Sequence, residues 1–389
     1  MRSKLLAIGL LANSFLFAQF KVSFTVDHLP EGHKPTDSLY IAGSFNGWNP
    51  GDEKAQLHFD GHKYGITIDL PRGKTEYKMT RGSWEKVEAT EKGENIANRK
   101  ADVESDTTIH VEIHQWADHF RHEEKKSTAS RNVHILDSNF YMPQLDRHRR
   151  VWIYLPKSYK TSKKKYPVLY MQDGQNIFDA ATSFSGEWGV DEALDSIDTK
   201  ECIVVGIDNG REKRLNEYCP YDMAEHGKGE GDLYLAFIVK TLKPYIDQHF
   251  RTKRSRENTF IAGSSMGGLI SFYAMLKYPA VFGGAGVFSP AFWIAPDLMK
   301  DVAKRAAKVK GRIYFYAGKQ ESETMVPGML AIFQKMHQLS KAQMEIVIRD
   351  EGTHSEAHWR EEFPKFYGWL NPRSATAERA SVQGYTKLH

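Results

Sequence analysis

Two patterns of apolar and polar positions divide the chain. In the first, short runs alternate apolar and polar residues and are separated by turn-forming residues; they cover 22–26, 38–42, 63–68 and 108–113. Alternation with a period of two is typical of strands that bury one face. We therefore expect an all-β sandwich of immunoglobulin-like type over residues 20–113.

The second pattern begins after residue 132, where apolar runs alternate with segments of helical periodicity. The apolar runs are 168–171, 203–207, 259–262, 311–317 and 343–348, and helical patterns cover 269–276, 327–339 and a segment that begins near 356. Strands that alternate with helices are typical of a sheet with helices packed on it. We therefore expect an α/β domain over residues 133–372.

A candidate nucleophile lies between one of these apolar runs and the helical pattern after it. Residues 263–267 read Gly-Ser-Ser-Met-Gly, the G-x-S-x-G pattern, with Ser265 at its centre. On a strand-to-helix turn, Gly263 and Gly267 avoid collisions with the sharply bent backbone, and the hydroxyl projects beyond the sheet edge. The first turn of the helix adds N–H groups and partial positive charge beside it. Ser265 is therefore the expected nucleophile.

The candidate base is a histidine near the end of the chain. A serine hydroxyl needs a base to remove its proton, normally a histidine that a carboxylate orients. His354 lies in the polar loop after the run 343–348, at a strand end. His358 is close in sequence but falls in the helical pattern that begins near residue 356. We expect His354 to be the base.

The candidate acid is Glu321, which lies just beyond the run 311–317. Glu323, two residues further on, and Asp350, in the loop of the histidine, remain alternatives. The chain order is then nucleophile, acid and histidine. This is the order of α/β-hydrolases, and it differs from the orders in the chymotrypsin and subtilisin folds.

Five ordered segments carry a family resemblance. They are 166–179, 204–209, the turn around Ser265, 288–293 and 352–354. From about residue 131 to 372, the chain resembles the esterase family that includes esterase D, carbohydrate esterase family 1 with its feruloyl and acetyl-xylan esterases, the enterochelin esterases and the mycolyltransferases. The resemblance implies an α/β-hydrolase fold and a reaction without a cofactor.

The same resemblance implies roles for further residues. Two backbone N–H groups would bind the oxyanion: that of Met266, directly after the nucleophile, and that of Gln175, in the loop after an earlier strand. The acid of the family usually follows the glycine that ends the penultimate strand, and Glu321 fits that place. Trp188 and Trp293 are expected near the substrate, although either could belong to the core.

The sandwich region carries a second resemblance. Residues 43–49 read Gly-Ser-Phe-Asn-Gly-Trp-Asn, and Tyr-Lys-Met at 77–79 precedes Trp84. These segments resemble the starch- and glycogen-binding modules of branching enzymes and AMP-activated kinase, in which a flat aromatic ring stacks on a sugar. Trp48 and Trp84 are then the candidate carbohydrate-binding residues, or they pack the sandwich. The usual Asp-Pro element after the second tryptophan is replaced by Lys-Val-Glu at 86–88.

The N-terminus predicts export. Arg2 and Lys4 precede a mostly apolar stretch, 5–17, which Ala18 follows. This is the pattern of a cleaved secretory signal, assigned here to residues 1–19, and it predicts a secreted or periplasmic protein. No later segment is long and apolar enough to span a bilayer, so no integral membrane segment is expected after signal removal.

Composition narrows the remaining classes. With 389 residues and 41% hydrophobic content, the chain can build two globular cores. Its 53 basic and 49 acidic residues are spread along the chain, so no nucleic-acid partner is expected. Cys202 and Cys219 could form a disulfide, with two buried thiols as the preferred interpretation.

Two segments lack the patterns of a domain. The segment 114–132 is charged and rich in histidine, and it is predicted to be a linker. Its histidines match no specific spacing of metal ligands, so no metal site is expected. Residues 373–389 lack apolar periodicity and are predicted to be a flexible tail.

Together these features predict an exported serine ester hydrolase. The sugar-binding-like module favours an ester substrate linked to polysaccharide, with feruloyl or acetyl groups. A siderophore esterase that cleaves trilactones is the alternative, since enterochelin esterases also place a β-sandwich before the hydrolase, and an acyltransferase is a third. A non-catalytic binding protein would need an incomplete triad, of which the sequence gives no sign.

Overall fold

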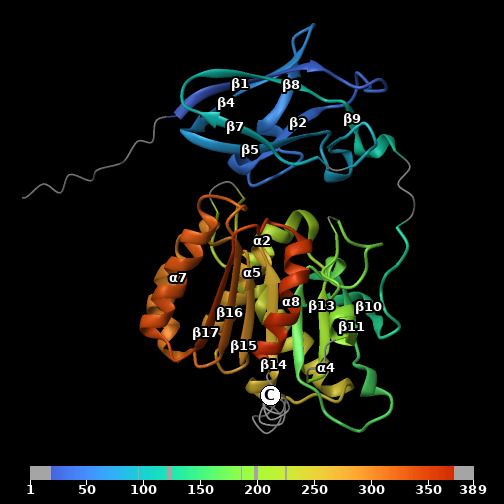
Figure 1. Ribbon diagram of the computed structural model, residues 1–389, viewed down its shortest axis with the longest axis vertical. Coiled ribbons are helices and arrows are strands. Elements are labelled where there is room, and N and C mark those ends of the chain that lie inside the picture. The colour runs from blue at the N-terminus through green and yellow to red at the C-terminus, as the bar shows by residue number, and fades with distance from the viewer. Residues whose placement is uncertain are drawn as a thin grey trace, which may run out of the picture. The chain divides into compact units, whose positions relative to one another are not determined.

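The computed structural model describes residues 19–94, 96–120, 125–184, 186–196, 200–223 and 226–371. The chain forms two compact units, Met1–Glu123 and Glu124–His389, which Figure 1 shows. The predicted tail lies outside the described residues, and so does the predicted signal except for Gln19, which belongs to a strand. Across the described ranges, no helix is both long and apolar enough to cross a bilayer.

The first unit is the expected β-sandwich, with strands in the order β7-β5-β2-β3-β4-β1-β8. These strands are β1 (Gln19–His28), β2 (Leu39–Gly43), β3 (Gln56–Phe59), β4 (Tyr64–Pro71), β5 (Gly73–Thr80), β7 (Arg99–Val103) and β8 (Thr107–Glu112). The first half of β3 pairs with β2 and its second half with β4, so β3 joins the two layers. Along β1, Val22, Phe24 and Val26 point into the core, which explains the alternating sequence.

The sandwich unit ends later in the chain than the alternating pattern predicted. Strand β9 (Gln115–Trp116) pairs with β6 (Glu88–Ala89), and the short 3-10 helix η4 (Ala117–His119) follows. Trp116 is fully buried in the sandwich core. The predicted linker 114–132 is therefore structured where it begins, because a two-residue strand is too short to give a periodic signal.

The second unit is built on an eight-stranded sheet in the order β10-β11-β13-β12-β14-β15-β16-β17. The strands are β10 (Val133–Met142), β11 (Arg147–Tyr154), β12 (Val168–Gln172), β13 (Ile203–Ile207), β14 (Thr259–Ser264), β15 (Gly284–Phe288), β16 (Arg312–Gly318) and β17 (Gln343–Arg349). The last six are parallel to one another, whereas β10 and β11 form an antiparallel edge. This is the predicted α/β architecture.

Helices connect the strands and cover the sheet (Figure 1). They are α1 (Val190–Ser196), α2 (Arg214–Tyr218), α3 (Gly231–Phe237), α4 (Lys243–His249), α5 (Met266–Lys277), α6 (Leu298–Arg305), α7 (Met325–Leu339) and α8 (Glu356–Leu370), with the π-helix η8 (Ile238–Leu242) between α3 and α4. On β12, Tyr170 joins one apolar core, and Leu169 and Met171 join the core on the opposite face. A strand buried on both faces gives a continuous apolar run, as the sequence showed.

The two cysteines lie inside this unit. Cys202 directly precedes β13 and Cys219 directly follows α2, and both are buried free thiols. The preferred interpretation from sequence, two buried thiols, is confirmed, and the alternative disulfide is not formed.

Candidate active site

The parallel strands bring the candidate residues to one edge of the sheet. Ser265 follows β14, Gln175 follows β12, Glu321 follows β16 and His354 follows β17. β12 is the neighbour of β14, β16 is the neighbour of β17, and β15 lies between the two pairs. The carboxyl ends of parallel strands are where open α/β sheets bind their ligands.

Ser265 occupies a sharply bent backbone between β14 and α5. Its φ is 57° and its ψ is −121°, a combination that residues other than glycine rarely adopt. The Ser265 N–H donates to the Phe288 carbonyl across 2.9 Å, and the Ser265 carbonyl accepts the Ala291 N–H across 3.1 Å. A Cβ on Gly263 would lie 2.8 Å from the Gln172 side chain, so this turn can pack against β12 only with glycine there.

Glu321 and His354 form a hydrogen-bonded pair. Nδ1 of His354 donates to Oε2 of Glu321 across 2.8 Å. The other carboxylate oxygen, Oε1, accepts from the Gly318 N–H at 2.6 Å and from the Ser289 hydroxyl at 2.7 Å. The side chain of Glu321 is 1% exposed and that of His354 is 36% exposed. The buried carboxylate of Glu321 thus fixes the orientation of the His354 imidazole, which is partly exposed to solvent.

Ser289 joins this pair to the aromatic core. Its hydroxyl accepts from the Trp359 indole N–H across 2.9 Å while it donates to Glu321. Trp359 also packs edge-on against the His354 ring, with the ring centroids 5.1 Å apart. Ser289 lies within one of the segments that carry the family resemblance, but its partners are 32 and 70 residues away, so the sequence did not indicate this role.

The competing residues near Glu321 and His354 have other surroundings. Asp350 has a side chain that is 75% exposed and pairs with Lys319 across 2.7 Å. Glu323 is exposed in the loop before α7. Nδ1 of His358 lies 2.9 Å from the Thr353 hydroxyl. Of the three carboxylates that the sequence offered, Glu321 is the one that the structure places on the His354 ring.

The loop after β12, which carries Gln175, is fixed by partly buried hydrogen bonds. Asp173 begins this loop with a φ of 56°, and the 3-10 helix η6 (Gly174–Asn176) follows. The Asp173 carboxylate accepts from Nε and Nη2 of Arg214 at 2.7 and 2.9 Å, and from the Asn209 amide at 2.8 Å. The Gln175 side chain accepts the Asn209 N–H across 3.1 Å. The backbone of the loop is therefore held from two sides.

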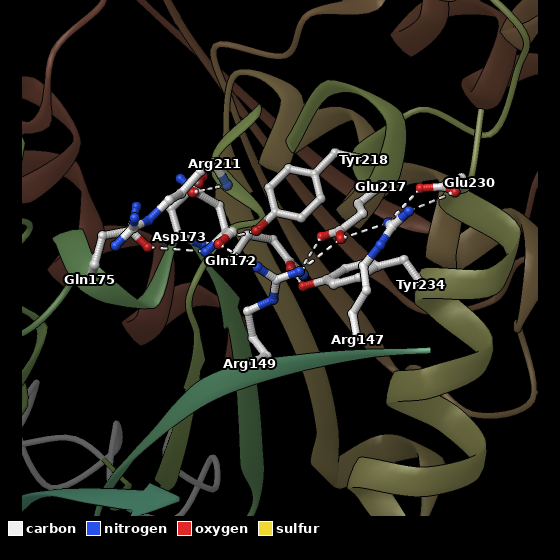
Figure 2. Close-up of polar contacts among 11 residues, drawn as sticks. Arg147, Arg149, Gln172, Asp173, Gln175, Arg211, Glu217, Tyr218, Glu230 and Tyr234 are labelled. Carbon is white, nitrogen blue, oxygen red and sulfur yellow. Dashed lines mark hydrogen bonds and ion pairs between the residues drawn. The ribbon is translucent and has the colours of Figure 1, made fainter. Parts of the chain in front are cut away.

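Figure 2 shows a network of charged side chains beside this loop. Glu217 in α2 is fully buried and accepts from Arg149 at 2.7 Å and from Arg147 at 2.9 Å. Arg147 also pairs with Glu230 at 2.6 Å. The two pairs with Glu217 anchor α2, the helix that carries Arg214, to strand β11. A buried carboxylate requires such partners, because an unpaired charge in the interior is costly.

Two ionisable groups near the loop have shifted pKa values. Burial opposes the charged form of Arg214, but the Asp173 carboxylate outweighs it and raises the pKa of the guanidinium. Burial also raises the pKa of the Glu356 carboxyl group, which accepts from the Asn176 amide across 3.3 Å. The sequence did not single out these residues, because no local pattern reveals partners so far apart along the chain.

The structure separates the two tryptophans that were expected near the substrate. Trp188 is buried against Trp359, with ring centroids 5.6 Å apart, so it packs behind the histidine and presents no open face. Trp293 is 58% exposed in the 3-10 helix η10 (Phe292–Ile294), which follows β15, and the Ala291 N–H just before this helix donates to the Ser265 carbonyl. Phe184, which the sequence did not single out, is 52% exposed in the segment after Gln175.

In the sandwich unit, Trp48 and Trp84 lie against each other with ring centroids 6.4 Å apart. Trp48 has a φ of 60°, and the turn before it is held by the Asn46 side chain, which accepts the Gly43 N–H across 2.8 Å. Trp84 also packs against the small apolar cluster of Val87, Ala89 and Ala117. Both indoles are partly buried, so packing accounts for part of each ring and leaves part exposed.

The arrangement suits attack of a hydroxyl on a carbonyl carbon. A serine at a helix N-terminus and an imidazole fixed by a carboxylate are the parts that acyl transfer requires. The first N–H groups of α5 have no acceptor within their own helix and can bind an anion. Among the described residues, no group of three or more His, Cys, Asp or Glu side chains is arranged to hold a metal ion.

Comparison with known proteins identifies the family. The family described as "Putative esterase" matches residues 143–370, more than half of the chain. The uncharacterized protein YbbA of Bacillus subtilis is 27% identical over 238 residues, which cover 57% of this chain and 92% of YbbA. An endo-1,4-beta-xylanase/feruloyl esterase of Xylanibacter ruminicola is 27% identical over 176 residues, 43% of this chain and 23% of that protein.

A solved structure agrees with this assignment at the level of the fold. The enterobactin esterase FES of Shigella flexneri, solved in the presence of enterobactin, has a TM-score of 0.51 and 14% identity, and the match covers 90% of this chain and 92% of that one. At such low identity, the match shows a shared fold, here the α/β-hydrolase fold, and nothing more. On the strength of the family match, the chain belongs to this esterase family and is a carboxylic ester hydrolase.

Proposed function

We propose that Ser265 is the nucleophile, His354 the general base and Glu321 the residue that orients the imidazole. Oγ of Ser265 attacks the ester carbonyl carbon while Nε2 of His354 takes the hydroxyl proton. The imidazolium gives this proton to the departing alcohol, which leaves an acyl-enzyme. Water, deprotonated by His354, then attacks the acyl carbon and releases the acid together with the free serine.

The observation that carries this proposal is the hydrogen bond between Glu321 and His354. The carboxylate engages Nδ1 across 2.8 Å, so the tautomer leaves Nε2 as the acceptor that a serine base needs. Two donors, Gly318 and Ser289, hold the other carboxylate oxygen. This support favours Glu321 over the two other carboxylates that the sequence left open.

We assign the oxyanion site to the N–H groups of Met266 and Gln175. Met266 is the first residue of α5, where the N–H lacks an intrahelical acceptor and the helix dipole is positive. Gln175 belongs to the loop of the adjacent strand β12, which Asn209 and Arg214 brace. One preorganised donor of this kind typically lowers the barrier by about 3 kcal/mol.

For the substrate, we propose feruloyl or acetyl esters of polysaccharide-derived alcohols. We propose that the protein is exported and acts on them outside the cytoplasm. Three features support this choice: the signal-like N-terminus, the partly exposed pair of Trp48 and Trp84, and the similarity to the xylanase/feruloyl esterase of Xylanibacter ruminicola. The exposed Trp293 offers an aromatic face to such an acyl group. The alternative is a siderophore trilactone, supported by the match of the Shigella flexneri enterobactin esterase to 90% of this chain.

A turnover panel tests both levels of the proposal. The purified full-length protein and its Ser265→Ala and His354→Ala variants are assayed on methyl ferulate, acetylated xylan and an iron-bound triscatecholate trilactone. We expect the wild type to turn over the first two substrates. In each variant we expect kcat to fall on the order of 10⁴-fold while the melting temperature stays unchanged. Preferred turnover of the trilactone would favour the alternative, and acyl products on an added alcohol would indicate a transferase. Wild-type-like activity in either variant would refute the mechanism.

A further inference from the structure

The chain enters the hydrolase unit through a strap, residues 125–132, that lies along a row of carboxylates. The Ser127 hydroxyl donates to Asp179 (2.9 Å), the Thr128 hydroxyl to Glu187 (2.8 Å), the Ser130 N–H to Asp191 (2.7 Å) and the Asn132 amide to Asp195 (3.1 Å). Donors and acceptors follow in the same order along the chain. The strap was predicted to be part of a linker, yet its polar groups are committed to specific partners.

The carboxylates along the strap depend on these donors. Asp179, Glu187 and Asp191 are buried. Buried carboxylate oxygens need hydrogen-bond donors, because burial removes their water partners. Most of the donors that the strap provides are uncharged hydroxyl and amide groups. Removing one leaves a buried oxygen without that partner, so the segment that carries these acids depends on the strap.

The turn at Asp179 in turn holds the residue proposed as an oxyanion donor. Oδ1 of Asp179 accepts the Thr128 N–H at 3.1 Å and the Ala181 N–H at 2.9 Å. The next residue, Thr182, donates its hydroxyl to the Gln175 carbonyl across 2.7 Å. A shift of this turn therefore moves the peptide groups of Gln175, and displacements of about 1 Å at such a donor are enough to slow catalysis.

The same strap residue is also connected to the histidine side of the site. The Thr128 hydroxyl accepts the Ala180 N–H across 2.8 Å while it donates to Glu187. The Glu187 carbonyl accepts from Nε of Arg360 across 2.9 Å. Arg360 lies in α8, which begins two residues after His354. The Thr128 hydroxyl thus connects the segment after Gln175 to α8, the helix that follows His354.

We propose that Thr128 and Asp179 are positioning residues for ester hydrolysis. The strap holds the turn after Asp179 so that the Gln175 N–H points at the oxyanion as it forms. This role rests on the proposed function, because it acts through a donor assigned there. Both residues act through Gln175 in this proposal, and neither is assigned a contact with the substrate. On this proposal, the strap contributes to catalysis by positioning the oxyanion donor and does more than link the two units of the chain.

The test uses four variants of the full-length chain. Thr128→Val keeps the side-chain shape and removes the hydroxyl, and Thr128→Ser restores it. Asp179→Ala removes the acceptor of the turn. Thr161→Val is the matched control, because Thr161 is exposed in the turn before β12 and its hydroxyl makes one long contact of 3.4 Å, to the Ser158 carbonyl. The readouts are kcat and KM for p-nitrophenyl acetate, the rate of inactivation by a p-nitrophenyl phosphonate, and Tm.

We expect kcat to fall roughly tenfold in Thr128→Val and roughly a hundredfold in Asp179→Ala, with KM nearly unchanged, because the lost interaction belongs to the transition state. Inactivation by the phosphonate should slow by similar factors, since a phosphonyl oxygen occupies the oxyanion site. Thr128→Ser and Thr161→Val should behave as wild type.

A lower Tm with unchanged kcat and inactivation rate in Thr128→Val would overturn the inference, because the strap would then only stabilise the fold. Thr128→Val decides alone if Asp179→Ala does not fold. Ser265→Ala separates this inference from the proposed function. If that variant is inactive and the Thr128 and Asp179 variants keep wild-type rates, only the role of the strap fails. If Ser265→Ala remains active, the proposed function itself fails.

Discussion

Removing the Ser289 hydroxyl should cost both stability and activity. The hydroxyl donates to Oε1 of Glu321 across 2.7 Å and accepts from the Trp359 indole across 2.9 Å, and all three side chains are buried. Ser289→Ala leaves the indole N–H without this acceptor and the carboxylate with the Gly318 N–H as its remaining donor on that oxygen. An unsatisfied buried polar group costs about 1–3 kcal/mol, so we expect a loss of about 3 kcal/mol in the free energy of unfolding.

The effect on turnover should be smaller than that of losing the carboxylate. In Ser289→Ala, Glu321 keeps its carboxyl group and its contact with His354, but Oε1 loses one of its two hydrogen-bond donors. We expect kcat to fall roughly tenfold with KM unchanged, against about 10⁴ when a triad carboxylate is replaced by its amide. Initial rates with p-nitrophenyl acetate and urea unfolding followed by tryptophan fluorescence measure the two quantities.

A matched control lies in α5, the helix after Ser265. Ser271 is fully buried, and its hydroxyl has no hydrogen-bond partner among the described residues. Ser271→Ala should therefore leave kcat unchanged and should not lower stability. If Ser289→Ala loses stability but keeps the wild-type kcat, the hydroxyl only satisfies the indole and does not restrain Glu321. Equal losses in both variants would mean that any buried serine in this region gives the same effect.

Three further predictions follow from the same geometry. Glu321→Gln should lower kcat strongly and Glu323→Gln weakly, and the reverse order in steady-state assays would show that the acid is misassigned. Burial and the neighbouring Asp191 raise the pKa of Glu192 to about 7, so the folded chain keeps this proton between pH 4.5 and 7 while the unfolded chain loses it, and stability falls as the pH rises through that window. Glu192→Gln should therefore raise the free energy of unfolding at pH 8 but not at pH 4, and an equal shift at both values in urea titrations would contradict this reasoning. Deletion of residues 20–120 keeps the strap, so it should spare turnover of small soluble esters. Turnover of acylated xylan should fall, because the sandwich would contribute substrate capture. Equal losses on both substrates, in a truncated protein that melts cooperatively, would mean that the sandwich helps to form the site.

Local sequence patterns were sufficient for the fold and for the turn at Ser265. The bend needs glycines at fixed spacing and a strand and a helix on either side, and all of these are neighbours in sequence. His354 could be chosen over His358 because a strand end differs from a helix in periodicity. These features are encoded within a few residues, so one sequence is enough to predict them.

The residues that orient Glu321, the proposed acid, could not be found in this way. The position after Gly318 favoured Glu321 in sequence but left Glu323 open, because the contacts that distinguish them come from the Gly318 N–H and from Ser289, which follows the neighbouring strand β15. The strap illustrates the same limit. Its serine, threonine and asparagine residues have the composition of a linker, and their carboxylate partners come more than 50 residues later, as for Ser127 and Asp179.

The two buried thiols can serve as intrinsic probes of opening motions in the hydrolase unit. Burial raises the pKa of the Cys202 thiol to about 12, and burial also raises that of Cys219, so little thiolate exists at neutral pH. An alkylating reagent can then react only in molecules where the start of β13 or the end of α2 has transiently opened. The rate of mass gain at each cysteine would thus measure, without any engineered label, how often the sheet beneath the active site and the helix that carries Arg214 open.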